Sequence, residues 1–287
     1  MRLDRYDRVA DFLAAAGAYL VEREAEHNLM LGLSGNLSRG EALGATEGAP
    51  YLSVITESGR VVLAAFRTPP WNLLLSEVGD ETREADALAL LADDVASQAL
   101  PGVIGPPPAA RRFAELWTAS HPVRSEVVLE ERIYGLEHLV EPPPVPGVAR
   151  PASLADRRLV TEWFVAFHDE ALPAEGSDRA RRTIEEWDPA TGRQFWLWVV
   201  DGREVCLVGA GSPTPNGIRI GPVYTPPEHR RRGYASALTA FVSGRLLAEG
   251  RRFCFLYTDL ANVTANRIYQ AIGYRPVTDA LMLRFVR

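Results

Sequence analysis

The chain has 287 residues, of which 47% are apolar and 24% charged, and 31 basic against 37 acidic side chains give a net charge of −6. This composition is that of a globular protein and excludes wholesale disorder, and the length suggests two domains. No apolar run approaches the roughly 20 residues of a membrane helix, and the charged N-terminal sequence is unlike a secretory signal. We therefore expect a cytoplasmic protein.

The first half shows a mixture of helical and strand periodicities. The predicted helices cover residues 4–17, 25–37, 81–99 and 109–120. The predicted strands cover residues 51–57, 61–67, 71–78 and 123–139. Ser58-Gly59 supplies a hairpin turn between the first two strands. We therefore expect this half to form a mixed α/β sheet.

A proline-rich segment follows, residues 141–147, with the sequence Glu-Pro-Pro-Pro-Val-Pro-Gly. Proline lacks a backbone donor and stiffens the chain, so the segment is neither a helix nor a central strand. It is either a linker or a rigid loop inside one domain. The linker interpretation gives a first domain over residues 1–140 and a second over 148–287.

The second half repeats the order of elements of the first. Its predicted helices cover residues 153–171, 177–187, 233–249 and 264–272. Its predicted strands cover residues 194–200, 204–210, 218–224, 253–258 and 275–284. The shared order predicts a degenerate structural duplication, although the residue identities of the two halves do not match.

Charge is distributed unevenly along the chain. Residues 221–287 hold ten arginines and four acidic residues, a balance of 10 − 4 = +6, so residues 1–220 carry −12. Such asymmetry indicates a site for an anionic partner in the last quarter. The acidic chain as a whole argues against nucleic acid, and a small phosphorylated ligand fits better.

The strand at 218–224 leads into three consecutive arginines and then into a long helix that starts with small residues, Gly233 and Ala235. The small residues let a ligand approach the backbone. First-turn N–H groups have no intrahelical partner, and the helix dipole is positive there. This pattern predicts a diphosphate-binding cradle, although the Walker and dinucleotide glycine motifs are both absent.

Two sequence blocks resemble the GNAT superfamily of N-acetyltransferases. The family's phosphate loop is matched by Arg230-x-x-Gly233-x-Ala235. Its next motif is matched by Asn262-x-x-Ala265-x-x-Ile268-Tyr269, followed by Gly273-Tyr274. The resemblance covers about residues 147–287, and over 1–146 only the order of elements is similar. It implies two tandem mixed-sheet acyl-CoA N-acyltransferase-like domains, of which the first is degenerate.

The resemblance implies that acetyl-CoA is the cosubstrate. The histidines outside the base cluster are scattered without the spacing of metal ligands, so we expect no metal. In the family, the strand before the loop splays from its neighbour, and Pro222, which cannot donate to a ladder, fits such a strand. The coenzyme would then contact the strand backbone, the amides and arginines of the loop, and the first residue of the second motif. The implied cofactor-binding residues are Val223, Tyr224, Arg230, Arg231, Arg232, Gly233, Tyr234, Ala235, Ser236 and Asn262.

The same resemblance places Tyr269 near the thioester sulfur, where a protonated phenol can donate to the leaving thiolate. The alternatives are that Tyr269 is a core aromatic residue and that Asn262 only caps a helix. For the general base, Glu170 is favoured within a cluster that also holds His168, Asp169 and Glu175, and a water chain is the alternative. No nucleophile–base motif is present, so direct transfer is expected.

The first half lacks a basic loop after its third strand, where residues 79–84 read Gly-Asp-Glu-Thr-Arg-Glu. Acidic residues there would repel a pyrophosphate, so we expect this half to be a scaffold that does not bind coenzyme A. The implied function is acetyl transfer to a primary amine of a small molecule or peptide. The alternatives are transfer of a longer acyl group and a non-catalytic acyl-CoA sensor or partner-binding module. We expect a monomer or homodimer that binds neither nucleic acid nor membrane.

Overall fold

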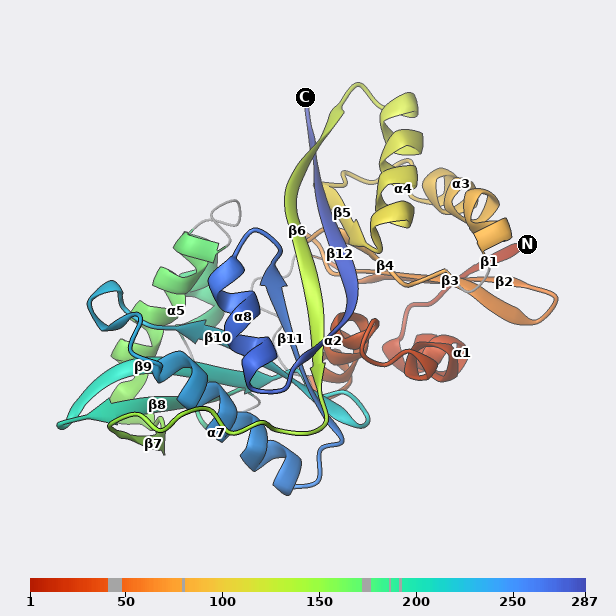
Figure 1. Ribbon diagram of the computed structural model, residues 1–287. Coiled ribbons are helices and arrows are strands. Elements are labelled where there is room, and N and C mark those ends of the chain that lie inside the picture. Colours follow the sequence, from red (N-terminus) through yellow and green to blue (C-terminus); the bar gives the residue numbers. More distant parts are fainter. Residues whose placement is uncertain (41–47, 79–80, 172–176, 186, 191–192) are drawn as a thin grey trace. The chain divides into compact units, whose positions relative to one another are not determined.

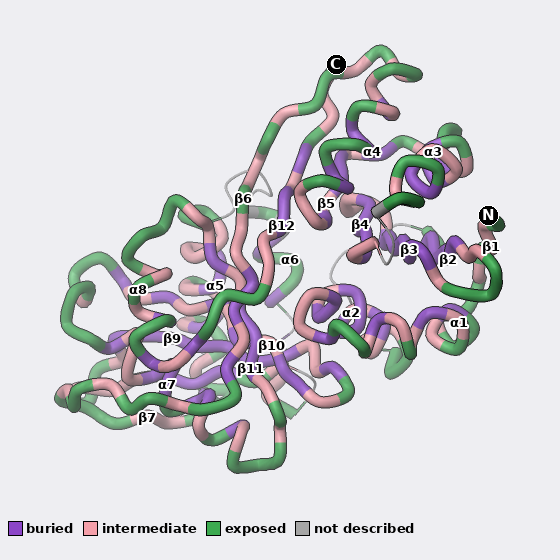
Figure 2. The backbone as a smooth tube through the Cα atoms, turned by 45° about the vertical axis from the view of Figure 1, so that its right-hand side comes forward, coloured by how far each residue is buried: buried purple, intermediate pink, exposed green. Residues whose placement is uncertain are grey.

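The computed structural model describes residues 1–40, 48–78, 81–171, 177–185, 187–190 and 193–287 (Figure 1). Contacts divide the chain into two compact units. Unit 1 holds the described residues up to Arg132 together with Thr278–Arg287, and unit 2 holds the described residues of Ile133–Val277. In Figure 2, buried residues follow the central strands and the inner sides of the helices.

Unit 1 is a mixed sheet with two helices packed on each face. Its sheet has the order β1-β2-β3-β4-β5-β12. Helices α1 and α2 cover one face and α3 and α4 the other, each over its own apolar core. The first half of the chain contributes β1 (Arg2–Arg5), α1 (Val9–Glu22), α2 (Asn28–Ser38), β2 (Tyr51–Glu57), β3 (Arg60–Arg67), β4 (Leu73–Leu75), η1 (Glu81–Arg83), α3 (Glu84–Asp94), β5 (Gly102–Gly105), α4 (Pro107–Ser120) and β6 (Arg124–Leu136).

Unit 2 has the same plan, with the sheet order β6-β11-β10-β9-β8-β7. Helices α5 and α6 pack on one face of this sheet, and α7 and α8 pack on the other. The second half of the chain contributes β7 (Val148–Pro151), η2 (Leu154–Asp156), α5 (Arg157–Ala171), α6 (Ser177–Ile184), β8 (Gln194–Val200), β9 (Arg203–Gly211), β10 (Gly217–Tyr224), η4 (Pro227–His229), α7 (Tyr234–Ala248), β11 (Phe253–Asp259), α8 (Val263–Ala271) and β12 (Arg275–Val286).

Each half of the chain gives its last strand to the sheet of the other half. Strand β12 pairs antiparallel with β5, with Leu281 opposite Gly105, and Leu281 and Leu283 are buried in the core of α3 and α4. At the end of β6, Tyr134 and Leu136 are buried in the core of α7 and α8. The compact units therefore differ from the predicted ranges of 1–140 and 148–287, because sequence patterns do not reveal an exchanged strand.

The sequence patterns do not reveal three short strands that the structure contains. Three of the four residues of β1 are charged, the four residues of β5 begin and end with glycine, and β7 contains a proline that an edge strand tolerates. The helix predicted over 4–17 begins only at Val9. Strands as short as these carry too little alternation to be distinguished from loops.

The proline-rich segment lies along α7 and forms what we call the strap, residues 139–147 (Figure 1). A Cβ at Gly244 would lie 2.9 Å from Leu139, and a Cβ at Gly233 would lie 2.8 Å from Val145. These glycines are 11 residues apart, about three helical turns, so they lie on one face of α7. The Trp198 indole donates to the Pro146 carbonyl at 2.9 Å. The segment is neither helix nor strand, as predicted, but it is packed against unit 2 and is not a free spacer.

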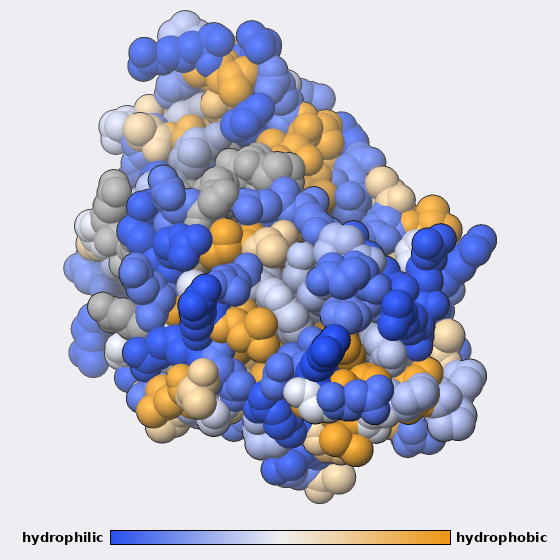
Figure 3. Space-filling model, turned by 90° about the vertical axis from the view of Figure 1, so that its left-hand side faces the viewer, coloured by the Kyte–Doolittle hydropathy of each residue, from blue (hydrophilic) through white to orange (hydrophobic). Residues whose placement is uncertain are grey.

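On the face shown in Figure 3, apolar side chains form small separate patches between hydrophilic ones. Among the described residues, no helix is long and apolar enough to cross a membrane. Both cysteines are buried thiols, as their apolar sequence context indicates.

An ion-pair network fixes the start of α5 and leads to a testable pH dependence. Arg150 donates to both oxygens of Asp156 at 2.8 Å, and Asp156 also accepts from the backbone N–H of Ser153. The Arg150 guanidinium lowers the pKa of Asp156 to about 2, below its unfolded value of about 3.9. Because the folded pKa is the lower one, the stabilisation is complete above pH 4 and is lost as the pH falls towards 2.

We expect Asp156→Asn to lower the free energy of unfolding by roughly 1–2 kcal/mol at pH 7 and by about half as much at pH 3. Urea denaturation at both pH values measures this difference. Glu162→Gln, which breaks a more exposed ion pair with Arg158, serves as the control and should change stability little. An equal loss at pH 3 and pH 7 would show that the Asp156 charge does not act in this way.

Candidate functional site

Strands β10 and β11 separate part of the way along their length. They pair in parallel from Gly217 opposite Phe253 to Arg219 opposite Phe255, and no later pair joins them among the described residues. The pairing of β10 with β9 shifts register between Ile220 and Val223, which places a bulge there. The strands therefore separate beyond Arg219, beside the predicted residues Val223 and Tyr224. The resemblance implies a slot for the pantetheine arm at this separation, and we call it the slot.

The loop after β10 leaves a row of backbone N–H groups unpaired. Arg231 has a φ of 62° and Gly233, the N-cap of α7, has a φ of 82°, both in the left-handed region. The N–H groups of Arg231, Arg232 and Gly233 donate to no described acceptor, and the helical bonds begin with Ala237 to Gly233 at 3.0 Å. The first-turn amides, including that of Ser236, are free by helix geometry. This loop has the character of the predicted anion cradle.

The side chains of the predicted cradle residues have different surroundings. Tyr234 is buried and Ala235 partly buried in the core of α7 and α8, so each can offer only its backbone N–H to a ligand. Arg231 and Arg232 are exposed and form no ion pair with a described carboxylate. Their guanidinium groups are therefore available to a phosphate.

Arg230, by contrast, is occupied by the protein itself. Its Nε donates to the Thr225 carbonyl at 2.8 Å, and its Nη2 donates to both carboxylate oxygens of Glu170 at 2.7 Å. The guanidinium carbon also lies 5.9 Å from the centre of the Tyr224 ring. Arg230, Glu170 and Tyr224 thus form one cluster that fixes the start of the loop to α5.

The ion pair with Arg230 allows a test of the predicted role of Glu170 as general base, which stays a prediction, against a role in positioning Arg230. We expect Glu170→Gln to raise the KM for acetyl-CoA roughly three- to tenfold and to change kcat less than threefold, because Arg230 loses its charged partner. Steady-state kinetics with each substrate varied in turn measures the two effects. A large fall in kcat at unchanged KM would instead identify Glu170 as the proton acceptor.

Tyr269 is buried in the core of α7 and α8. Its burial and, to a smaller extent, the nearby Cys206 raise the pKa of its phenol. Its hydroxyl has no hydrogen-bond partner among the described residues. Two of the other buried tyrosines of this core do have partners: Tyr134 binds Asn266 at 2.8 Å, and Tyr274 binds Ser243 at 2.9 Å. Tyr269 therefore packs as a core residue and still keeps a protonated, unused hydroxyl.

Asn262 is the N-cap of α8, and its side-chain oxygen accepts the Ala265 N–H at 3.0 Å. The capping interpretation is therefore confirmed. The side-chain nitrogen donates to no described group, so a contact with a pantetheine chain remains open to it and stays a prediction.

His168, in the last turn of α5, is another member of the predicted base cluster. Its Nδ1 lies 2.9 Å from the Phe164 carbonyl, which requires Nδ1 to be the donor and leaves Nε2 with its lone pair. Burial, with Arg193 nearby, lowers the pKa of His168, so the ring is neutral at pH 7. Glu175, the last member of the predicted cluster, lies outside the described residues.

Unit 1 has no counterpart of this arrangement in its described part. Strands β4 and β5 pair at Leu73 and Leu74, and a Cβ at Gly105 would lie only 2.9 Å from the Leu75 side chain, so the two strands stay close together. Helix α3 begins with acidic residues, Glu84 and Asp86. Residues 79 and 80 of the predicted acidic loop lie outside the described residues. The described part of unit 1 thus supports the interpretation of this half as a scaffold.

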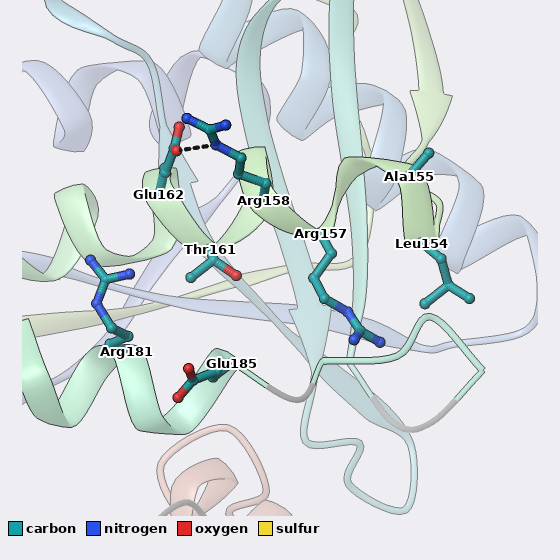
Figure 4. A pocket seen from close by; sticks show the side chains of 8 residues that line it. All are labelled: Leu154, Ala155, Arg157, Arg158, Thr161, Glu162, Arg181 and Glu185. Atoms are coloured by element: carbon teal, nitrogen blue, oxygen red, sulfur yellow. Dashed lines mark hydrogen bonds and ion pairs between the residues drawn. The ribbon is translucent and has the colours of Figure 1, made fainter.

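A separate open groove lies on the outer side of α5 and α6 (Figure 4). Basic and acidic side chains alternate around it, and it contains none of the predicted site residues. It is lined by Leu154, Ala155, Arg157, Arg158, Thr161, Glu162, Arg181 and Glu185.

In the described part of the chain, no group of three His, Cys, Asp or Glu side chains could hold a metal ion.

Comparison with known proteins agrees with this architecture. Residues 204–282 match the family described as FR47-like protein, and no curated protein matches the chain. A protein from Drosophila has the same fold over 99% of this chain and 98% of its own, with 12% identity and a TM-score of 0.69.

Two further solved structures extend this likeness to proteins described as acetyltransferases. A GCN5-related N-acetyltransferase from Sphaerobacter thermophilus covers 98% of this chain and 95% of its own, with 18% identity and a TM-score of 0.58. A tandem GNAT protein from the clavulanic acid biosynthesis pathway covers 99% of this chain and 98% of its own, with 14% identity and a TM-score of 0.56.

These likenesses show the fold of the protein. The chain has the tandem GNAT fold of two mixed α/β sheets, and the predicted resemblance of its C-terminal half to GNAT N-acetyltransferases is confirmed. The FR47-like match, residues 204–282, includes β10, the cradle loop and α8. The roles of the individual site residues stay predictions.

Proposed function

We propose that the protein is an acetyl-CoA-dependent N-acetyltransferase that transfers the acetyl group directly to a primary amine. The observation that carries this proposal is the β10–β11 slot, which ends beside a loop of unpaired amides. The unpaired amides of residues 231–236, reinforced by the helix dipole and by exposed Arg231 and Arg232, suit a pyrophosphate. Backbone groups of Val223 and Tyr224, and the Asn262 side chain, would hold the pantetheine arm along the slot.

In the reaction, the amine nitrogen attacks the thioester carbonyl, a C–N bond forms and the C–S bond breaks. Tyr269 would donate its proton to the departing sulfur, which leaves as the free thiol of coenzyme A. The raised pKa of this phenol keeps it protonated at neutral pH, and its hydroxyl is not engaged by any described group. A positioned acid of this kind contributes roughly 10²–10⁴-fold to a rate.

The attacking amine must lose a proton, and we propose His168 Nε2 as the acceptor. Its ring is neutral and its Nδ1 is fixed by the Phe164 carbonyl, whereas Glu170 is held by Arg230. A His168→Gln variant compared with Glu170→Gln separates the two. The variant that lowers kcat and removes the acidic limb of the kcat/KM profile identifies the proton acceptor.

Calorimetric titration of acetyl-CoA tests the binding half of the proposal. We expect one site per chain, because unit 1 lacks a slot among its described residues. Two sites would mean that unit 1 also binds the coenzyme. No binding by folded protein would overturn the proposal.

The Tyr269→Phe variant tests the catalytic half. We expect acetyl-CoA affinity to stay within about twofold and kcat to fall about tenfold, because only the proton donor is lost. The Tyr274→Phe variant is the matched control. It removes a hydroxyl from the same core, one that is hydrogen-bonded to Ser243. Unchanged turnover in Tyr269→Phe would exclude its role as acid. Binding of acetyl-CoA by a wild-type protein that turns over no amine would instead favour the alternative, a non-catalytic acyl-CoA sensor.

A further inference from the structure

Two arginines, Arg193 and Arg219, lie side by side on the α5 face of the sheet of unit 2. Ile218 and Ile220 are buried in the core of α7 and α8, so Arg219 between them projects from the opposite face. In β9, the residue directly across from Arg219 is Gly211. A Cβ at Gly211 would lie 3.5 Å from Cα, Cβ and Cγ of Arg193. The missing side chain of Gly211 thus makes room for a second arginine beside the first.

Neither guanidinium is neutralised by a described part of the protein. Arg193 lies with its Cζ 5.7 Å from the centre of the Phe164 ring, and Arg219 donates to the Ser212 hydroxyl at 3.4 Å. No described carboxylate forms an ion pair with either arginine. Burial and, to a smaller extent, the charge of Arg219 lower the pKa of Arg193 to about 10, so Arg193 keeps its positive charge at pH 7. Two adjacent, partly buried cations are unfavourable unless an anion joins them.

The position of this arginine pair relates it to the slot. Arg219 is the last residue of β10 that pairs with β11, so it stands at the closed end of the slot. Farther along β10, the Tyr224 ring lies beside Trp163 of α5, with 6.2 Å between ring centres. Tyr224 is therefore on the α5 face of the sheet, the same face as Arg219. The cradle amides belong to α7, which packs on the other face. The arginine pair is therefore separate from the proposed pyrophosphate site.

We propose that Arg193 and Arg219 bind an anionic group of the acceptor, so that the substrate is a primary amine that also carries a carboxylate or a phosphate. This inference rests on the proposed function, and it specifies the substrate class. Guanidinium groups match both anions with paired N–H donors. Anchoring the anion at the closed end of the slot would direct the amine along the α5 face, towards the proposed His168.

This inference is tested with pairs of amine acceptors that differ only in an anionic group. The rate of acetyl transfer to each acceptor is measured as release of the free thiol of coenzyme A. The carboxylate pair is L-phenylalanine against 2-phenylethylamine, and the phosphate pair is O-phosphoethanolamine against ethanolamine. We expect kcat/KM to be at least tenfold higher for the anionic member of one pair, which identifies the anion. In Arg193→Gln/Arg219→Gln this ratio should fall below about threefold, while acetyl-CoA affinity stays unchanged. An equal or inverted ratio in the wild-type protein would overturn the inference.

A binding measurement keeps the test decisive if none of these amines is turned over. We expect acetate or inorganic phosphate to raise the Tm of the wild-type protein above that in chloride at equal ionic strength. We expect a smaller rise in the double variant, in which only the cradle can still bind an anion. Arg158→Gln, which removes an exposed arginine of α5, is the control and should behave like wild type. The absence of any difference between wild type and the double variant refutes the anion site. Failure of acetyl-CoA to bind refutes the proposed function instead.

Discussion

Replacing Gly233 by alanine is expected to weaken acetyl-CoA binding about thirtyfold or more. The residue holds a φ of 82°, where a side chain is strained, and its new Cβ would lie 2.8 Å from Val145 of the strap. To relieve the backbone strain or the contact with Val145, the N-cap of α7 must move. The free amides then no longer point together at the proposed pyrophosphate position. A thirtyfold loss corresponds to about 2 kcal/mol, and calorimetric titration measures it.

Gly250, at the other end of α7, supplies the control. It has a φ of 102°, but a Cβ at this position would meet no atom within 4 Å, so Gly250→Ala introduces backbone strain far from the cradle. We expect this variant to lose stability and to keep its acetyl-CoA affinity. If both variants lose affinity alike, the effect comes from global destabilisation and not from the cradle.

Dividing the chain within the strap, between Pro144 and Val145, is expected to abolish the independent folding of both pieces. The N-terminal piece lacks β12, whose Leu281 and Leu283 are buried in unit 1. The C-terminal piece lacks Tyr134 and Leu136 of β6, which are buried in unit 2. Each piece would expose both a sheet edge and an apolar core.

Separate and joint expression of the two pieces measures this effect. We expect insoluble or unfolded pieces when they are made alone, and a soluble complex with cooperative thermal unfolding when they are made together. Two pieces that each unfold cooperatively on their own would contradict the exchange of strands.

Much of unit 2 could be predicted because its signals are local. The strands over residues 194–200 and 204–210, the loop from Arg230 to Gly233 and the capping of α8 by Asn262 each depend on residues close together in the sequence. The slot was also predictable, because Pro222 weakens the strand ladder at the place where the register shifts. These elements follow from local backbone chemistry together with the family motif.

The remaining features depend on pairs of residues that are distant in sequence. Arg230 and Glu170 are 60 residues apart, so nothing in the helix end around Glu170 reveals its partner. The same holds for Arg193, whose place beside Arg219 depends on a glycine in a third segment. His168 could have been ranked higher, because a histidine near the end of a buried helix face can donate to the carbonyl four residues earlier.

The exchanged strands also set an order for folding during synthesis. Domains of a growing chain generally fold as units, with the N-terminal one first. Unit 1 cannot follow this rule, because Thr278–Arg287 belong to it and are translated only after all of unit 2. We expect the sheet of unit 1 to keep an unpaired edge at β5 until β12 has left the ribosome. The proposed scaffold is therefore completed after the unit that carries the proposed site.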